Sequence, residues 1–376
     1  MDDYTLTQSK LDYALEQSLA SIKRNIARIG KNKPIIGDGI IYKFSERDSW
    51  VEGFWPGQLW LAYSETKDRA YLDAARAYTP YFENRLKNSI KLDHDLGFLY
   101  TLTAVADFKL TNNLSAKATA LKAADMLKAR YQKKAKFILA WDNWAHKNNE
   151  GRMIIDSLEN IHLLFWASSV TGDSSYKDIA TNHCFSSAEH IVRNDGSSFH
   201  CFDFDPKTGQ AIAGATHQGF SDSSCWSRGQ SWGIHGFAQA YQYSHNKIFL
   251  ETAQKMADYA IEHLPDDYIP VWDYNLPKDQ IQYIDSSAAA ITAAGLQLLA
   301  LELGDKKGGA YKDVAYKIIV GLIDTCSTFA YKDAQGLLFH GARHVNDGDF
   351  DNMLPYGDYY FLEALLRAKG RTEFFW

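Results

Sequence analysis

Two aspartates, far apart in the sequence, stand where a carboxylate could act as an acid or a base. The stretch LDHDLGFLY places Asp93 and Asp95 on either side of His94, directly before an apolar run. A helix that begins there needs one aspartate to cap its free N–H groups, so the second carboxylate and the histidine need another explanation. The stretch GRMIIDSLEN places Asp156 inside an apolar run, past the first turn of a predicted helix, where no cap is needed.

Burial would change the chemistry of such a carboxylate. A buried carboxylate without a partner is costly, and burial raises its pKa. Asp156 could therefore keep a proton near neutral pH, although a lone buried aspartate is usually satisfied by a neighbouring Ser or Asn. A second aspartate at the same pocket changes this interpretation, because two carboxyl groups are the minimum for acid–base chemistry on a glycoside. We predict that Asp95 and Asp156 form a catalytic pair.

Three further polar side chains lie in a segment that we predict to be loop-rich, residues 196–227. HCFDFDP contributes His200, and ATHQGFSD contributes His217 and Gln218. A loop of this length between helices is often functional. With His94, these residues are therefore candidates for substrate binding, although any single histidine could instead be structural.

The stretch CWSRGQSWGIHGF combines a cation with aromatic rings. Arg228 and Trp232 are four residues apart and share one face of a predicted helix. An arginine near a helix N-terminus is electrostatically unfavourable unless it serves an anion, so Arg228 is a candidate clamp for a substrate carboxylate. The alternative is an ion pair with an acidic side chain of the protein. Four tryptophans could stack on sugar rings or pack in the core: Trp50, Trp141, Trp226 and Trp232.

The composition limits the classes of partner. The 376 residues carry a net charge of −6 with no Lys/Arg-rich stretch, which argues against nucleic acid and against a polybasic membrane surface. The four cysteines are scattered, which favours neither a zinc site nor a disulfide scaffold. The apolar stretch AAAITAAGLQLLALEL contains Thr, Gln and Gly and is typical of a buried helix rather than a membrane span. The polar start MDDYTLTQSK is unlike a signal peptide, so we expect a cytoplasmic protein, a monomer or weak homo-oligomer.

Helical periodicity dominates the chain and predicts about twelve helices. They span residues 3–29, 53–66, 68–88, 94–111, 113–133, 153–171, 175–193, 228–245, 247–264, 285–304, 308–329 and 355–370. Amphipathic helices alternate with helices that are apolar on most faces, as expected for an outer and an inner ring. We therefore predict an all-α (α/α)6 barrel, a toroid of six helical hairpins that forms a single catalytic domain over residues 1–376. An open helical solenoid is the alternative, and it would usually end in polar capping repeats.

The polar residues of the inner helices cluster at the N-terminal ends of these helices. In a toroid the inner helices run parallel, so these ends meet at one mouth, where helix dipoles favour anionic ligands. We predict that this mouth holds the active site. The clustered residues are Trp50 and Glu52, His94 and Asp95, Arg152 and Asp156, Trp226 and Arg228, Asp285 and Ser286, and Asp358.

Seven ordered stretches together resemble the unsaturated glucuronyl hydrolases, glycoside hydrolase family 88. They run from residue 50 to residue 367 and read WVEGFWPGQLWLAY, LDHDLGFLY, GRMIIDSLENIHLLFW, SSFHCFDFDP, GATHQGFSDSSCWSRGQSWGIHGFA, YIDSSAAAITAAGL and PYGDYYFLEALLR. The resemblance implies an (α/α)6 barrel and an intracellular enzyme. Such an enzyme acts on the 4,5-unsaturated uronic acid that polysaccharide lyases leave on glycosaminoglycan fragments. It hydrates the double bond and thereby releases the unsaturated sugar.

The resemblance also implies roles for individual residues. Asp156 matches the proton donor of the family and Asp95 its second essential aspartate, and no cofactor or metal is required. Asp95 would orient the system and raise the pKa of Asp156 by its charge. Arg228 or a histidine would hold the C5 carboxylate of the substrate. The positions that match the substrate subsite are Trp50, His94, Trp141, His200, His217, Gln218, Trp226, Arg228 and Trp232.

Two stretches depart from the pattern of the family. Glu52 stands where an aspartate is usual, with little expected effect. Some members that prefer sulfated chondroitin units carry Ser and Lys in the loop before PYGDYYF. That loop reads GARHVNDGDFDNM here, without Lys, which does not favour a 6-sulfate preference.

The residues leave three other functions open. A related unsaturated rhamnogalacturonyl hydrolase would perform the same chemistry on pectin fragments. A sugar 2-epimerase on the same toroid would use a pair of histidines and would be indifferent to the loss of Asp156. A non-enzymatic sugar-binding protein would not need a buried acid.

Overall fold

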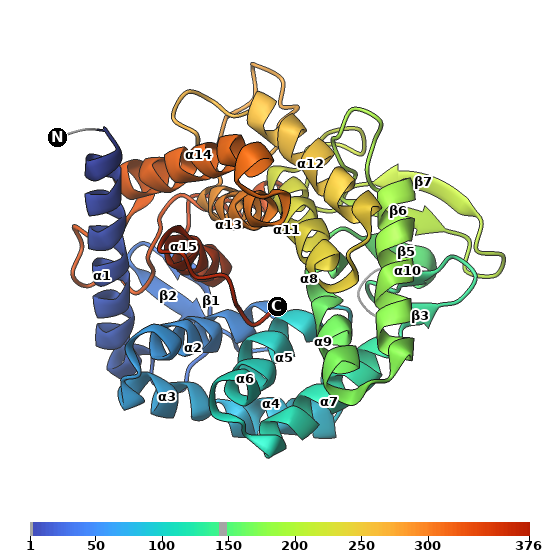
Figure 1. Cartoon of the computed structure of the whole chain (residues 1–376), viewed down its shortest axis with the longest axis horizontal. Coiled ribbons are helices and arrows are strands. Elements are labelled where there is room, and N and C mark those ends of the chain that lie inside the picture. The colour runs from blue at the N-terminus through green and yellow to red at the C-terminus, as the bar shows by residue number, and fades with distance from the viewer. Residues whose placement is uncertain (1–2, 143–148) are drawn as a thin grey trace.

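The helices form two concentric rings in a computed structural model that describes residues 3–142 and 149–376 (Figure 1). The outer ring contains α1 (Asp3–Ile29), α3 (Arg69–Arg76), α4 (Thr79–Lys87), α7 (Leu114–Lys128), α10 (Ser174–His190), α12 (Lys247–Glu262) and α14 (Asp305–Gly321). The inner ring contains α2 (Phe54–Thr66), α5 (Leu96–Tyr100), α6 (Ala106–Thr111), α8 (Ser157–Asn160), α9 (His162–Thr171), α11 (Ser227–Ser244), α13 (Ser286–Leu303) and α15 (Pro355–Ala368). The last inner helix, α15, packs against both α13 and α2 and so closes the ring. The prediction of an (α/α)6 barrel is confirmed, and the open solenoid is wrong.

Local chemistry breaks several of the predicted helices. The predicted helix 68–88 divides into α3 and α4 at Pro80, which cannot donate a backbone hydrogen bond. A π-helical turn, Thr101–Val105, joins α5 to α6, and a second one, Leu322–Cys326, follows α14. By composition α13 is the one helix among the described residues that could cross a membrane, but 83% of that window is buried inside the ring. The prediction of a buried helix at this position is therefore confirmed.

Short strands at the rim were not predicted. β1 (Pro34–Asp38) pairs with β2 (Ile41–Phe44), and β3 (Tyr131–Gln132) pairs with β4 (Phe137–Ile138). β5 (Arg152–Ile154), β6 (Cys201–Phe204) and β7 (Ala211–Ala215) form an antiparallel sheet, in which Arg152 binds the opposite Asp203 with two contacts of 2.7 Å. The predicted helix 153–171 therefore begins as a strand, and the segment predicted to be loop-rich contains a hairpin. Periodicity cannot distinguish such short apolar runs from helix, and the cross-strand ion pair favours the sheet.

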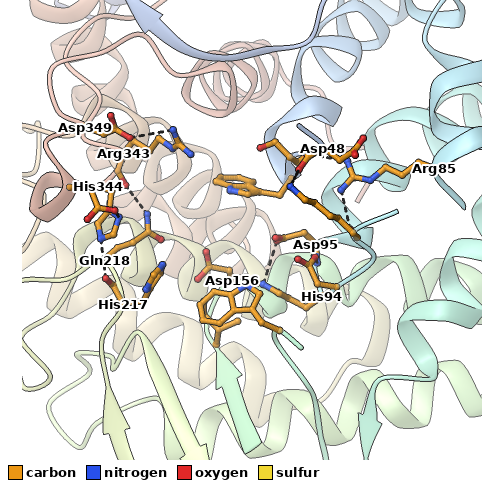
Figure 2. A pocket seen from close by; sticks show the side chains of 17 residues that line it. Asp48, Arg85, His94, Asp95, Asp156, His217, Gln218, Arg343, His344 and Asp349 are labelled. Atoms are coloured by element: carbon orange, nitrogen blue, oxygen red, sulfur yellow. Dashed lines mark hydrogen bonds and ion pairs between the residues drawn. The ribbon is translucent and has the colours of Figure 1, made fainter. Parts of the chain in front are cut away.

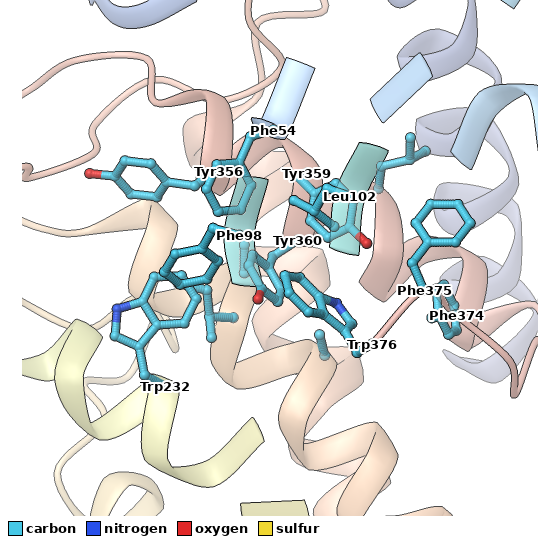
Figure 3. Close-up of a cluster of buried hydrophobic side chains, with 14 of the residues drawn as sticks. Phe54, Phe98, Leu102, Trp232, Tyr356, Tyr359, Tyr360, Phe374, Phe375 and Trp376 are labelled. Atoms are coloured by element: carbon cyan, nitrogen blue, oxygen red, sulfur yellow. The ribbon is translucent and has the colours of Figure 1, made fainter. Parts of the chain in front are cut away.

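The chain ends inside the ring, where the inner helices finish (Figures 1 and 3). Lys109, near the end of α6, donates from Nζ to the carbonyl oxygens of Phe374 and Phe375 at 2.9 and 3.1 Å. Tyr243, near the end of α11, donates to the carbonyl oxygen of Trp376 at 2.8 Å, and the Trp376 ring stacks on Tyr360. The C-terminal ends of the inner helices thus surround this segment, and their N-terminal ends face the opposite side.

A buried ionic cluster lies on the axis between the two ends. His235 of α11 contacts Glu159 of α8 at 2.9 Å and Glu363 of α15 at 3.2 Å, and Arg367 also binds Glu363 at 2.7 Å. Burial alone would lower the pKa of His235, but the two glutamates outweigh it and raise this pKa to about 9. The protonated imidazole therefore links three inner helices.

Asp358, in the first turn of α15, connects this inner helix to the β1–β2 hairpin and to the segment around Leu338. It is fully buried, and its carboxylate accepts hydrogen bonds from the Tyr42 hydroxyl of β2 and from the Leu338 backbone N–H at 3.0 Å. It does not line the pocket, in contrast to the predicted convergence of all six clusters at the mouth. Burial raises the pKa of Asp358 to about 7.

This raised pKa predicts a pH-dependent gain in stability for Asp358→Asn. The folded state binds the Asp358 proton more tightly than the unfolded chain, whose aspartate pKa is about 3.9. The stability from this proton is complete below about pH 4 and is lost as the pH rises through about 7. Asparagine does not ionise, so at pH 8 the variant should be more stable than the parent by roughly 1–3 kcal/mol. Thermal unfolding by circular dichroism from pH 4.5 to 8.5 measures this.

The control is Asp38→Asn, which changes an exposed aspartate on β1 of the same rim hairpin. Its melting temperature should follow that of the parent at every pH. A difference between Asp358→Asn and the parent that stays constant across this range would contradict the assignment of the pKa.

Candidate active site

A pocket of about 300 Å³ opens where the inner helices begin (Figure 2). Seven of the eleven predicted site residues line it, and they include both aspartates. Two walls rise from loops, one around residues 217–218 and one around residues 343–349. The lining residues are Asp48, Ser49, Trp50, Arg85, Lys91, Asp93, His94, Asp95, Trp141, Ile154, Asp156, His217, Gln218, Arg343, His344, Asp347 and Asp349.

Asp93 and Asp95, the two aspartates before α5, have different hydrogen-bond partners. Asp93 accepts the backbone N–H of Asp95 at 3.0 Å, and so takes the role of the local backbone acceptor. Asp95 occupies the N-cap position of α5, but its side chain accepts no capping hydrogen bond from the described part of the chain. Its Oδ1 lies 3.4 Å from Asn160 Nδ2 and 3.6 Å from His94 Nε2. The Asp95 carboxylate therefore faces the pocket and does not cap the helix.

Asp156 stands at the junction of β5 and α8. The prediction that it lies past the first turn of a helix is wrong, because the strand ends at Ile154 and Asp156 is the N-cap residue of α8. Its side chain makes no cap bond within the described residues and points into the pocket beside Asp95 (Figure 2). Its Oδ2 lies 3.4 Å from Nε2 of His200, which β6 brings alongside. The rim sheet therefore positions this carboxylate.

His200 acts on Asp156 from outside the pocket lining. Its Nδ1 accepts the backbone N–H groups of His217 and Gln218 at 3.2 and 3.1 Å, so the ring proton resides on Nε2 and faces Asp156. The Trp226 ring packs against the imidazole at a centroid distance of 4.2 Å, with the two ring planes tilted by 33°. Burial lowers the pKa of His200, which keeps the ring neutral.

His94 has a matching arrangement at the other aspartate. Its Nδ1 lies 3.0 Å from the buried Ser157 hydroxyl, and its Nε2 lies 3.6 Å from Asp95 Oδ1. Burial lowers the pKa of His94 to about 4, and the ring is neutral at physiological pH. Trp141 packs edge-on against this histidine at the pocket wall. Each aspartate therefore faces a neutral imidazole.

The two aspartates differ in protonation. Burial raises the pKa of Asp95 well above its usual range, and the charges of Asp93 and Asp156 raise it further. Burial also opposes ionisation of Asp156, but the contact with His200 at 3.4 Å outweighs it and lowers the pKa of Asp156. The expectation that Asp156 itself holds a proton near neutral pH is wrong for the ligand-free protein. The opposite directions of these two shifts favour Asp95 as the carboxyl group of the pair that is protonated.

Arg228 has the ion pair that was the alternative from the sequence. Its Nη1 lies 2.6 Å from Asp285, and its guanidinium also donates to the carbonyl oxygens of Ala342 and Arg343 at 2.6 Å each. The side chain is buried and does not line the pocket. Its Nε finds no acceptor among the described residues. In this structure Arg228 therefore anchors the loop that carries Arg343.

Trp232 lies in the aromatic core and not at the pocket wall. Its ring is fully buried against Phe98 at a centroid distance of 5.3 Å (Figure 3). Its indole N–H, like the Arg228 Nε, meets no acceptor within the described chain. A role as an open sugar-stacking face does not agree with this burial, whereas the unpaired N–H remains available for a ligand group.

The loop before α15 supplies pocket residues that were not predicted. Arg343 contacts Asp349 at 3.3 Å, and His344 contacts Asp347 at 2.6 Å and the carbonyl oxygen of His217 at 3.0 Å. The loop lies at the N-terminal end of an inner helix, which is the signal that could have identified it. On the opposite wall the unpredicted lining residues are Asp48, Ser49, Arg85, Lys91 and Asp93.

Glu52 stands where the family usually has an aspartate, and the structure shows which residues it contacts. Glu52 is fully buried, does not line the pocket and binds Arg85 at 2.8 Å and Lys33 at 3.2 Å. The residue therefore supports Arg85, which itself lines the pocket.

Known proteins share both this architecture and its sequence. A family model described as Glycosyl Hydrolase Family 88 matches residues 29–362. This chain belongs to glycoside hydrolase family 88. Members of this family are glycosidases, and this chain is therefore an enzyme of that class.

Two relatives are similar over nearly the whole chain. An unsaturated glucuronyl hydrolase from Bacillus sp. (strain GL1) is 40% identical over 368 residues, which cover 96% of this chain and 98% of the relative. The crystal structure of that enzyme, described as responsible for the degradation of glycosaminoglycan, matches with a TM-score of 0.94 over 97% of this chain and 99% of the other. A mutant unsaturated glucuronyl hydrolase from Streptococcus agalactiae, complexed with dGlcA-GalNAc6S, is 34% identical and matches with a TM-score of 0.85 over 97% and 93%.

The contact between His200 and Asp156 predicts the effect of His200→Ala. Without the Nε2–H group of His200 beside it, the pKa of Asp156 should rise, because a nearby donor favours the ionised form of a carboxyl group. Carboxyl ¹³C NMR of the ligand-free protein over pH 3–8 measures this, with Asp156→Asn to assign the signal.

The control is His162→Ala, which removes a buried histidine that stacks on Tyr243 near the end of α11. It should leave the Asp156 titration unchanged. An unchanged titration in His200→Ala as well would show that His200 does not stabilise the ionised carboxylate.

Proposed function

We propose that this chain is an unsaturated glucuronyl hydrolase that acts on lyase-generated glycosaminoglycan oligosaccharides. It would hydrate the C4=C5 double bond of the 4,5-unsaturated uronic acid at the non-reducing end. The observation that carries the proposal is the pair Asp95 and Asp156, which face one pocket and whose pKa values are shifted in opposite directions. The names of the two relatives support the same substrate class.

The reaction needs one acid and one water. The C4=C5 bond is an enol ether, so protonation at C4 places positive charge on C5 and the ring oxygen. Water adds at C5 and returns a proton to the conjugate base of the acid. The resulting hemiketal opens, and the second sugar is released. One carboxyl group that alternates between acid and base is sufficient.

In this proposal Asp156 is the general acid and base, and Asp95 holds the proton in the free enzyme. Substrate binding expels water from the pocket and brings the C5 carboxylate close to Asp156. Both effects raise the pKa of Asp156. The proton that Asp95 carries in the free enzyme then moves to Asp156, and the N–H groups of His94 and Asn160 stabilise the Asp95 anion.

Arg228 and Trp232 remain candidates for substrate contact in this proposal. Each keeps one buried N–H group, Nε and Nε1, without an acceptor among the described residues. A buried donor left unpaired is costly, and a ligand oxygen would pair it. Trp50, which lines the pocket and stacks on Tyr356, would supply a sugar-stacking face.

The rim of the pocket favours substrates of low charge. The loop before α15 contributes Asp347 and Asp349 to the pocket lining, and the segments before α2 and α5 contribute Asp48 and Asp93. These carboxylates would repel a sulfate on the leaving sugar. We propose an unsulfated disaccharide of hyaluronan or chondroitin as the preferred substrate, in agreement with a loop that lacks lysine.

A cytoplasmic location is part of the proposal. Its support is that Cys184, Cys201, Cys225 and Cys326 all carry free, buried thiols, which is typical of a reducing compartment.

The proposal predicts which variants lose activity. Ultraviolet absorbance of the C4=C5 bond should fall when the parent meets an unsaturated disaccharide of hyaluronan or chondroitin. Asp156→Asn should reduce kcat by about 10²–10⁴-fold, which is the usual contribution of a general acid. Heparin and pectin disaccharides serve as comparisons. Faster loss with the pectin unit would favour a rhamnogalacturonyl hydrolase, and no loss with any unit would contradict the proposal.

The rim charges predict a shift in specificity. Asp349→Asn removes a negative charge and frees Arg343, so kcat/KM for a 6-sulfated unit relative to the unsulfated one should rise about two- to five-fold. The gain should shrink at high salt. Asp351→Asn, an exposed residue of the same loop outside the pocket lining, is the control and should leave the ratio unchanged. An equal ratio in the parent and in Asp349→Asn would refute the role of the rim.

A further inference from the structure

Asn160 connects the segments that carry the two aspartates. It lies at the end of α8, one turn after Asp156, and is fully buried. Its Nδ2 donates to Asp95 Oδ1 at 3.4 Å and to the carbonyl oxygen of Asp156 at 3.1 Å. Its Oδ1 accepts the backbone N–H of Phe98 in α5 at 2.7 Å. One side chain therefore touches both aspartate segments.

The orientation of this amide is determined by its surroundings. Because Phe98 offers a donor, the oxygen of Asn160 must face Phe98, and the nitrogen must face Asp95. A Cβ atom at Gly97 would lie 2.3 Å from the Cα of Asn160, so the backbones of α5 and α8 are in contact at this point. The side chain has no room to turn away.

We propose that Asn160 is a positioning residue that fixes Asp95 relative to Asp156 and determines which oxygen of Asp95 carries the proton. The proposal rests on the proposed function, in which these aspartates exchange one proton. The N–H group of Asn160 addresses Oδ1 at 3.4 Å, and Nε2 of His94 lies 3.6 Å from the same oxygen. Oδ2 is therefore the oxygen that holds the proton, and the acid keeps a single orientation.

The variant Asn160→Asp separates positioning from a purely structural role. It keeps the shape and the acceptor for Phe98, and it replaces only the N–H donor with an oxygen. Ionised at high pH, the new carboxylate repels Asp95, and protonated at low pH, it donates as asparagine did. The other charged or titratable groups around Asp95 are Asp93 and His94 beside it, Asp156 before α8, and Arg85 of α4.

The expected result is a loss that depends on pH. A misplacement of about 1 Å costs on the order of 10²-fold in rate. Asn160→Asp should therefore have a kcat about 100-fold below the parent at pH 7.5 and should recover most of it near pH 5. The assay follows the ultraviolet absorbance of an unsaturated chondroitin disaccharide from pH 4.5 to 8.5.

The matched control is Asn25→Asp. Asn25 is a buried asparagine of α1 whose Nδ2 donates to the carbonyl oxygens of Ala334 and Gln335 at 3.0 and 3.1 Å. This variant should lower the melting temperature but keep the pH profile of the parent. A profile for Asn160→Asp that is scaled down with an unchanged shape would overturn the proposal.

A second measurement needs no turnover. Carboxyl ¹³C NMR of ligand-free protein, assigned with Asp95→Asn, should show that Asn160→Asp moves the Asp95 titration to higher pH, because a second carboxylate faces it. Asn25→Asp should not move it. An unmoved titration in Asn160→Asp would also overturn the proposal. If the parent hydrates no substrate, the proposed function fails, whereas this titration still decides the role of Asn160.

Discussion

The common direction of the inner helices is the constraint on which both ends of the molecule depend. Helices that start on one side leave their free N–H groups there and their free carbonyl groups on the other side. Carboxylates gather at the first side, where Asp95 and Asp156 face the pocket. Cations gather at the second side, where Lys109 binds the carbonyl groups of the C-terminal segment. Between the two ends, the protonated His235 binds Glu159 and Glu363.

The fold could be predicted because its signal is repeated along the whole chain. Six apolar helices that alternate with amphipathic ones have few stable arrangements, and the toroid is the one that buries them all. The rim sheet could not be predicted, because its stability depends on a partner strand about fifty residues away. Arg152 beside Met153 and Ile154 has no local signal for a strand until Asp203 lies opposite. The position of Asp156 was wrong for the same reason, since it depends on where that strand ends.

The site was predicted where residue type and helix end coincide, as for His94, Asp95 and Trp50. It was not predicted where a role depends on tertiary partners. Whether Arg228 serves a ligand or Asp285 depends on the packing of α11 against α13, which the sequence does not contain. The protonation of Asp156 depends on the tautomer of His200, which two backbone amides in a distant loop determine. The sequence indicates only that Asp156 is buried, and burial alone would raise its pKa, whereas the pKa is lowered in the structure.

The two histidines beside the catalytic pair, His94 and His200, are buried, and this burial keeps both rings neutral. A cationic imidazole beside either aspartate would favour ionisation of both carboxyl groups, and no acid would remain for C4. Burial prevents this for His94, whose pKa falls to about 4, and lowers the pKa of His200 in the same way. The amides of the 217–218 loop then turn the N–H group of His200 toward Asp156. The histidines thus stay neutral beside the two aspartates, so neither ring adds a positive charge that would favour ionisation of both carboxyl groups.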